Sequence, residues 1–253
     1  PLGHIGNKSV ALRPDGSVAV AGLQGRYRWE PGGELTALPL PLRGTRRVLG
    51  LADGRLLRQA DRSIQIVDAE GRLVPGGEVH EFHMVVAEAS PGRRTGVAFS
   101  RDERFVWFEV DPARFVPIGT HPAHHVAVGP GGWPLYLAHD QGIRVLHEDG
   151  REEPLFASGA PMYVLGMSPD GRWLAAADRD RTTWVVERET GVVRARMRGH
   201  ARRVSALAFA PDSQTLATGS WDDTIRFWDL RVFEAEPATL LAEAEARWGI
   251  TAD

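Results

Sequence analysis

The stretch GHARRVSALAFAPDSQTLATGSWDDTIRFWD, residues 199–229, decides the fold. It contains three short apolar runs, which are separated by Pro211-Asp212 and by Trp221-Asp222-Asp223. Apolar runs of this length, bounded by Pro, Gly and Asp, are typical of β-strands that are joined by tight turns. We therefore expect this stretch to form consecutive strands of an antiparallel sheet.

The same pattern is repeated throughout the chain. The preceding unit aligns at a constant offset of 42 residues, so that Asp180 lies over Asp222 and Val186 over Trp228. In five units an aspartate is followed six residues later by a large apolar residue, and these aspartates are Asp61, Asp102, Asp140, Asp180 and Asp222. An earlier unit, residues 10–30, keeps Pro14-Asp15-Gly16 but has Leu23 in place of the aspartate. The sequence thus holds six units with a period near 40 residues, which is the spacing of WD-type propeller blades.

Each unit divides into four apolar runs. In the fifth unit they predict strands at about 162–168, 172–177, 182–188 and 192–198. Four-stranded blades that stack radially bury their faces on one another and leave only short edges. We therefore predict an all-β fold, a single β-propeller of four-stranded antiparallel blades over residues 4–230. Six units predict six blades, and seven blades remain the alternative.

The last unit closely resembles the WD-repeat family. The resemblance rests on Gly199-His200, on Asp222 two residues after Ser220, and on Trp228-Asp229. It implies a hydrogen-bonded structural tetrad, which here would consist of His200, Thr218, Asp222 and Trp228. The other units also fit the looser Pro-Asp-Gly repeats of six-bladed periplasmic propellers. Residues 231–253 differ: Leu240, Leu241, Ala244 and Trp248 share one face at helical spacing, which predicts a short C-terminal helix or the start of a linker.

Composition narrows the class of protein. The net charge is -3 and the pI is near 6.3, which argues against general nucleic-acid binding. The chain has no cysteine, so disulfides, thiol nucleophiles and cysteine-ligated metals are excluded. Residues 1–9 show no signal-peptide pattern, and no apolar run approaches the length of a membrane helix, so we expect a cytoplasmic protein.

The sequence holds little that suggests catalysis. The repeated aspartates occupy one position in separate units, whereas a catalytic pair must converge on one point. His121, His124 and His125 are the only histidine cluster, and a metal would need a third or fourth ligand such as His139 or His147. We therefore predict no enzymatic activity, no metal and no cofactor. The alternative is a propeller enzyme of the hydrolase or lactonase type with a metal in its channel.

The resemblance implies that partners meet the top face of the propeller, near its central channel. The positions that would face a partner precede the turn aspartates or enter the first strands. They are cationic or aromatic and include no acid: Arg46, His83, Arg101, His124, His139, Tyr163, Arg179, Arg203 and Trp221. Arg, Tyr and Trp are the residues that most often dominate the energy of interfaces.

We therefore hypothesise a protein–protein interaction scaffold that binds an acidic or phosphorylated segment of a protein partner. Such a scaffold can be one module of a larger chain or complex. RNA or single-stranded nucleic acid is a lesser candidate, because arginines and exposed aromatic rings also stack on bases. A third interpretation is a structural subunit whose top face is permanently buried in an assembly, which predicts a large apolar patch.

Overall fold

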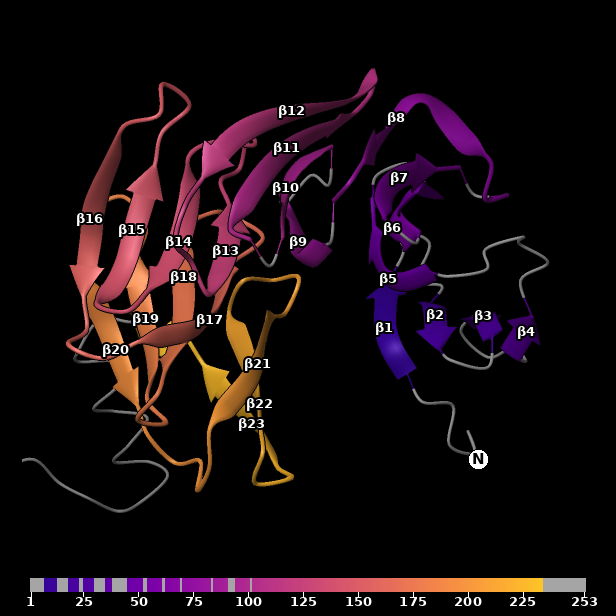
Figure 1. Ribbon diagram of the computed structural model, residues 1–253. Helices are drawn as coiled ribbons and strands as arrows, with labels where there is room; N and C mark the ends of the chain where they lie inside the picture. Colours follow the sequence, from indigo (N-terminus) through magenta and orange to yellow (C-terminus); the bar gives the residue numbers. More distant parts are fainter. Residues whose placement is uncertain are drawn as a thin grey trace, which may run out of the picture. The chain divides into compact units, whose positions relative to one another are not determined.

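The chain folds into antiparallel β-sheets with almost no helix, as its computed structural model shows (Figure 1). The structure describes residues 7–12, 18–22, 25–29, 35–37, 45–51, 54–60, 62–68, 70–82, 84–90, 94–100 and 102–233. Its strands form six sheets in sequence order, one for each repeat unit. The predicted all-β class and the four-stranded antiparallel blade are both confirmed.

The first three sheets each have four strands. The first comprises β1 (Asn7–Leu12), β2 (Val18–Gly22), β3 (Gly25–Trp29) and β4 (Leu35–Ala37). The second comprises β5 (Thr45–Gly50), β6 (Leu56–Ala60), β7 (Ser63–Val67) and β8 (Leu73–His80). The third comprises β9 (Met84–Ala89), β10 (Thr95–Ser100), β11 (Arg104–Val110) and β12 (Ala113–Thr120).

The next two sheets also have four strands, and the last has three. The fourth comprises β13 (His125–Val128), β14 (Leu135–His139), β15 (Gly142–Leu146) and β16 (Glu152–Ala157). The fifth comprises β17 (Met162–Met167), β18 (Trp173–Asp178), β19 (Thr183–Glu187) and β20 (Val193–Met197). The sixth comprises β21 (Val204–Phe209), β22 (Thr215–Ser220) and β23 (Ile225–Asp229). In the fifth unit every strand boundary lies within one residue of its prediction.

Turn chemistry explains these boundaries. Between β17 and β18, Gly171 adopts a φ of 73°, a left-handed conformation that glycine accepts without strain. Its N–H donates to the carbonyl oxygen of Ser168 at 2.9 Å, and the hydroxyl of Ser168 accepts from the N–H of Trp173 at 2.9 Å. Pro169-Asp170-Gly171, the Pro-Asp-Gly triplet of the fifth unit, therefore forms the turn between β17 and β18.

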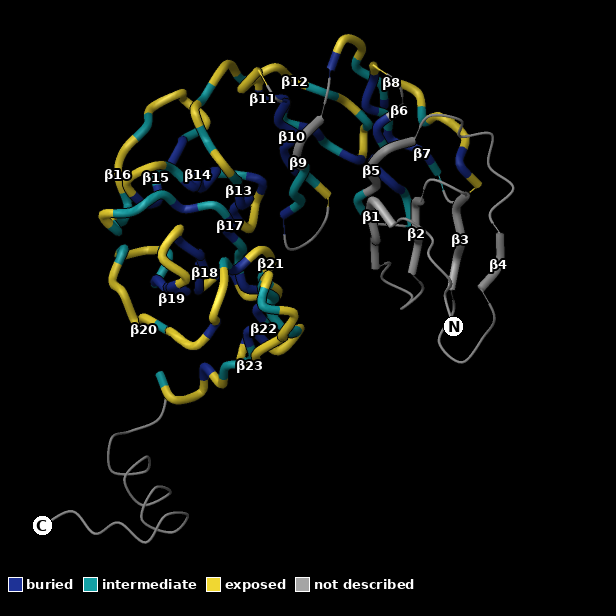
Figure 2. The backbone as a smooth tube through the Cα atoms, turned by 60° about the horizontal axis from the view of Figure 1, so that its bottom comes forward, coloured by how far each residue is buried: buried dark blue, intermediate teal, exposed yellow. Residues whose placement is uncertain are grey.

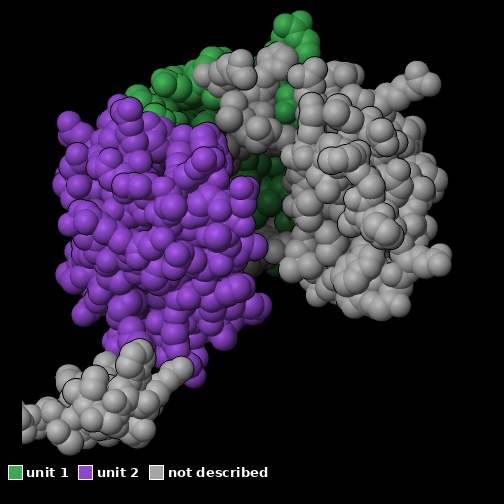
Figure 3. Space-filling model, turned by 90° about the horizontal axis from the view of Figure 1, so that it is seen from below, with its two compact units in different colours: residues 1–137, 144–153 green, residues 138–143, 154–253 purple. Residues whose placement is uncertain are grey.

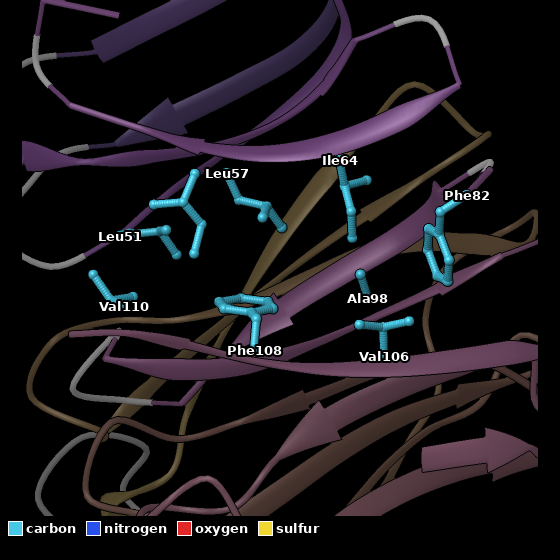
Figure 4. Close-up of a cluster of buried hydrophobic side chains, with 9 residues drawn as sticks. Leu51, Leu57, Ile64, Phe82, Ala98, Val106, Phe108 and Val110 are labelled. Atoms are coloured by element: carbon cyan, nitrogen blue, oxygen red, sulfur yellow. The ribbon is translucent and has the colours of Figure 1, made fainter. Parts of the chain in front are cut away.

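The chain divides into two compact units, which Figure 3 colours separately. Unit 1 holds residues 1–137 and 144–153, and unit 2 holds residues 138–143 and 154–253, so the boundary runs through the fourth sheet. In unit 1, large side chains from the second and third sheets fill a common core, which Figure 4 shows: Leu51, Leu57, Ile64, Phe82, Ala98, Val106, Phe108 and Val110. A Cβ on Gly96 would lie 2.4 Å from Cζ of Phe108, so this glycine makes room for the ring.

Unit 2 has a core between the fifth and sixth sheets. Figure 2 shows β18 and β19 as its most deeply buried strands. The fifth sheet contributes Trp173 and the small Ala175, both buried, and the sixth contributes Leu216 and Trp228. Small side chains on one face let the larger ones of the neighbouring sheet pack closely against it. Strands β17 and β21, the first strands of the two sheets, lie side by side.

The chain beyond β23 is described only as far as a short 3-10 turn, Arg231–Phe233. The predicted C-terminal helix, with Leu240, Leu241, Ala244 and Trp248, lies outside the described residues. Among the residues that the structure describes, no helix is long and apolar enough to cross a membrane.

Candidate functional site

Four side chains of the sixth sheet form one hydrogen-bonded chain in unit 2. Nδ1 of His200 lies 3.0 Å from a carboxylate oxygen of Asp222, and Nε2 lies 2.8 Å from the hydroxyl of Thr218. The same hydroxyl accepts from the indole N–H of Trp228 at 2.9 Å. The structure thus brings together the four residues that the family resemblance placed in a tetrad.

The donors and acceptors of this chain fix its direction. An indole N–H can only donate and a carboxylate can only accept. If Trp228 donates to Thr218, that hydroxyl donates to Nε2 of His200, and Nδ1–H donates to Asp222. Every polar side-chain atom along this chain of contacts then has a partner. The tetrad holds the turn before β23 against the segment that enters β21.

Asp222 anchors the tetrad to the backbone. Its carboxylate accepts from the hydroxyl and N–H of Thr224 and from the N–H of Ala201, at 2.5, 3.0 and 2.7 Å. These hydrogen bonds, with that from Thr224 the largest contribution, hold the pKa of Asp222 well below its usual range. The hydrogen-bonding positions of this carboxylate are therefore taken up by Thr224, Ala201 and His200, and its role is structural.

In the fifth sheet the structural aspartate is Asp178, two residues before the predicted one. Asp178 is buried, and it accepts from the N–H of Asp180, the N–H of Thr182 and the indole of Trp184 at 2.8, 2.9 and 2.8 Å. Asp180 itself is exposed at the tip of the turn. Ser158 and Val186 occupy the positions of His200 and Trp228 in this unit, so Asp180 has no tetrad partners there.

The predicted top-face residues separate into three groups. The side chain of Arg46 in β5, and His83 and Arg101 altogether, lie outside the described residues. His124 belongs to unit 1, where it is exposed just before β13. The remaining residues belong to unit 2: His139, Tyr163, Arg179, Arg203 and Trp221.

Three of these residues form what we call the arginine–aromatic cluster: Tyr163, Arg203 and Trp221. The guanidinium carbon of Arg203 lies 4.0 Å from the ring centre of Tyr163 and 5.5 Å from that of Trp221. The backbone holds the cluster, because the N–H of Trp221 donates to the carbonyl oxygen of Arg203 at 3.0 Å. Cation–π contacts with two aromatic rings hold the Arg203 guanidinium in place without a carboxylate partner.

Trp221 and Arg203 of the arginine–aromatic cluster remain able to contact a partner. Trp221 is 60% exposed. Among the residues that the structure describes, no carboxylate lies within ion-pair distance of Arg203, and its Nε is buried without a hydrogen-bond partner. The structure brings Arg179 to the neighbouring turn, where its N–H donates to the carbonyl oxygen of Pro161 at 2.9 Å.

The histidines of residues 121–125 do not converge. The ring of His121 packs edge-on against Phe105, 5.5 Å between centres, and burial lowers the pKa of His125 to about 4. Within the described part of the chain, no group of three or more His, Cys, Asp or Glu could hold a metal ion. The channel-metal alternative therefore finds no support in these residues.

A family model supports the repeat assignment. Residues 156–185 and 191–229, which form the fifth and sixth sheets, match the model of the WD domain, G-beta repeat. This part of the chain is therefore similar to repeats of the WD-repeat family.

Curated WD-repeat proteins show similar local matches. The human echinoderm microtubule-associated protein-like 2 is 32% identical over 126 residues, 47% of this chain and 18% of that protein. A guanine nucleotide-binding protein subunit beta from Schizosaccharomyces pombe is 35% identical over 71 residues, 28% of this chain and 23% of that protein. The transcriptional corepressor LEUNIG_HOMOLOG of Arabidopsis thaliana is 35% identical over 72 residues, 28% of this chain and 9% of that protein. The chain thus spans less than a quarter of each of these relatives.

Two further arginines of unit 2, Arg181 and Arg198, lie near Arg179 and were not predicted from the repeat. A pocket of about 460 Å³ is lined by Arg179, Asp180, Arg181, Arg198, Gly199 and His200. Arg198 immediately precedes Gly199-His200 of the WD-repeat motif, so its place in the segment between the two sheets could have been predicted from the alignment. That Arg181 shares the pocket depends on its backbone conformation, with a φ of 68°, which the residue type does not predict.

Proposed function

We propose that this chain is a protein-recognition module whose arginine–aromatic cluster binds an acidic segment of a protein partner. The observation that carries the proposal is the Arg203 guanidinium, which is held between Tyr163 and Trp221 and has no carboxylate partner among the described residues. A preordered arginine loses little side-chain entropy on binding, and its unused N–H groups match a carboxylate or phosphate. Trp221 adds exposed aromatic surface beside that charge.

Several features support recognition rather than catalysis. The cluster is carried by short turns on a closely packed sheet pair, which preorganises its surface. Arg and Trp are the residues that most often make large contributions to interface energy. The similar proteins include one named as a G-protein subunit and one named as a corepressor, and neither name describes an enzyme. A cationic site on a chain of net charge -3 also favours electrostatic attraction of acidic partners.

Affinity capture from a lysate of the source cells tests this proposal. The test variant is Arg203→Gln with Trp221→Ala, which removes the charge and the exposed ring. The matched control is Arg151→Gln with Phe227→Ala, because Arg151 is an exposed arginine of the β15–β16 turn and Phe227 is 73% exposed on β23. Each capture is carried out at low and high salt.

We expect the wild type and the control to retain the same protein, less of it at high salt, and the test variant to bind it at least about tenfold more weakly. Equal retention by the test variant would refute the assignment of the cluster. Retention of no protein at low salt would refute the recognition function itself.

A further inference from the structure

The pocket beside the arginine–aromatic cluster is built from two segments of unit 2. The β18–β19 turn contributes Arg179, Asp180 and Arg181, and the segment from β20 to β21 contributes Arg198, Gly199 and His200. Its volume of about 460 Å³ lies within the range of pockets that hold small ligands. Three of its six lining residues are arginines, which makes its chemistry that of an anion site.

Two further contacts shape the pocket. The guanidinium of Arg181 donates to the carbonyl oxygen of Ala201 at 3.2 Å, which ties the turn to the segment that enters β21. A Cβ on Gly199 would lie 3.1 Å from Nη1 and 3.2 Å from Cζ of Arg226. The head group of Arg226 therefore rests on the backbone of Gly199 and adds a fourth positive charge beside the pocket.

These arginines lack the counter-ions that others in this chain have. Elsewhere a carboxylate lies within 3.1 Å of each of several arginines: Arg72, Arg104, Arg114, Arg144, Arg188, Arg194 and Arg231. Within the described residues, no carboxylate is in ion-pair distance of Arg179, Arg181, Arg198 or Arg226. Like charges that face one shared space without counter-ions repel each other, and a bound anion removes that repulsion.

The acids around the pocket do not supply this anion. The carboxylate of Asp222 is occupied by His200, Ala201 and Thr224, and that of Asp178 by its own turn and Trp184. Only Asp180 remains, as an exposed residue of the lining. Three lining arginines against one such carboxylate leave an excess of positive charge, which a dianion matches better than a single carboxylate does.

We infer that this pocket binds a phosphate monoester dianion, presented by a phosphoserine or phosphothreonine of the protein partner. The inference rests on the proposed function, because the pocket lies beside the cluster that would hold the same partner. A phosphoryl group carries between about -1.5 and -2 charges at pH 7 and three strong acceptor oxygens, which several guanidinium groups can share. The pocket then distinguishes a phosphorylated partner from an unmodified one, while the arginine–aromatic cluster supplies the remaining contact.

The first experiment titrates the purified chain with three heptapeptides of sequence Gly-Ser-Gly-X-Gly-Ser-Gly, where X is phosphoserine, glutamate or serine. The Nε–Hε signals of 15N-labelled arginines report binding at each guanidinium. The test variant is Arg179→Gln with Arg198→Gln, because both side chains are exposed and make no hydrogen bond within the described residues. The control is Arg151→Gln, and inorganic phosphate and chloride at equal ionic strength are the reference anions.

We expect the phosphoserine peptide and inorganic phosphate to shift the Arg179, Arg181 and Arg198 signals saturably, and chloride and the serine peptide to leave them unchanged. The test variant should bind the phosphoserine peptide at least about tenfold more weakly, because it lacks two of the three lining arginines. A tenfold loss of affinity corresponds to about 1.4 kcal/mol. Equal shifts with chloride, or equal affinity for the glutamate and phosphoserine peptides, would overturn the inference. Wild-type affinity in the test variant would do the same.

A second experiment separates this inference from the proposed function. The lysate used for affinity capture is divided into portions treated with phosphatase, with nuclease, or with neither. Loss of the partner after phosphatase treatment alone supports the phosphate pocket. Capture that depends on Trp221 but survives phosphatase overturns the pocket assignment and leaves the proposed function standing. Capture that is lost only with nuclease assigns the surface to nucleic acid and overturns both.

Discussion

The substitution Thr218→Val tests whether the tetrad stabilises the sixth sheet. Valine nearly preserves the volume of threonine, but it removes the hydroxyl that links His200 to Trp228 at 2.8 and 2.9 Å. The hydroxyl and the imidazole are buried, so Nε2 of His200 and the indole N–H of Trp228 both lose their partner. Each unsatisfied buried group costs about 1 to 3 kcal/mol. The added methyl group recovers about 0.8 kcal/mol by burial.

The net cost of Thr218→Val is therefore about 3 kcal/mol, which corresponds to about a hundredfold increase in local opening at 1.4 kcal/mol per tenfold. Thr218→Ser is the matched control, because it keeps the hydroxyl and loses only a buried methyl group, for about 1 kcal/mol. Hydrogen–deuterium exchange of the amides in β21, β22 and β23 measures the opening of this sheet directly. The reasoning is refuted if the valine variant protects these amides as well as the serine variant does.

Three further predictions follow from the same contacts. Asp178→Asn should lower the free energy of unfolding by about 2 kcal/mol, because the amide that replaces the carboxylate leaves the indole N–H of Trp184 without an acceptor. Asp180→Asn should change the free energy of unfolding by less than about 0.5 kcal/mol. Urea unfolding of both variants checks this, and equal effects would contradict the assignment of Asp178. Burial lowers the pKa of His125 from 6.5 to about 4, so the folded state favours the neutral ring, and the free energy of unfolding of the wild type should fall by up to about 3 kcal/mol as the pH falls from 6.5 to 4. The free energy of unfolding of His125→Phe should fall by less between pH 7.5 and 4.5, and identical pH profiles of the two proteins would refute a neutral imidazole at this position. The lowered pKa of Asp222 means that its stabilising contribution is complete above its ordinary value of 3.8 and is lost as the pH falls below it. The free energy of unfolding of Asp222→Asn, measured by urea unfolding at a series of pH values, should therefore depend less on pH below 3.8 than that of the wild type, and an unchanged dependence would exclude the carboxylate as its source.

The sequence predicted the strands well because the repeat carries its own turn chemistry. Pro169-Asp170-Gly171 marks one turn by residue type alone, and the aligned Pro211-Asp212 marks its counterpart. The period then places the other strands without knowledge of tertiary contacts. The tetrad of the sixth sheet was predictable for the same reason, since all four of its residues are present at the family spacing.

The structural role of Asp178 was not predictable from the alignment. Alignment identifies equivalent positions, but which carboxylate is buried depends on the partners available around it. In the sixth unit Ser220 stands at the position of Asp178, so Asp222 is the aspartate that contacts His200. In the fifth unit both positions are aspartates, and the buried Asp178 is the one that accepts from Trp184. Arg181 and Arg198 of the pocket were missed for a related reason. Their grouping arises where a turn of one sheet meets the segment that leads to the next, and that proximity is a property of packing.

The contact between the fifth and sixth sheets is made from two unlike faces. Trp173 and Ala175 of β18 form part of one face, and Leu216 and Trp228 of the next sheet pack against it. An interface between two unlike surfaces is heterologous. Each sheet therefore receives the next sheet on one face only, and two copies of the same face do not pair. The order of these two repeats along the chain is therefore also encoded in the side chains that one sheet presents to the next.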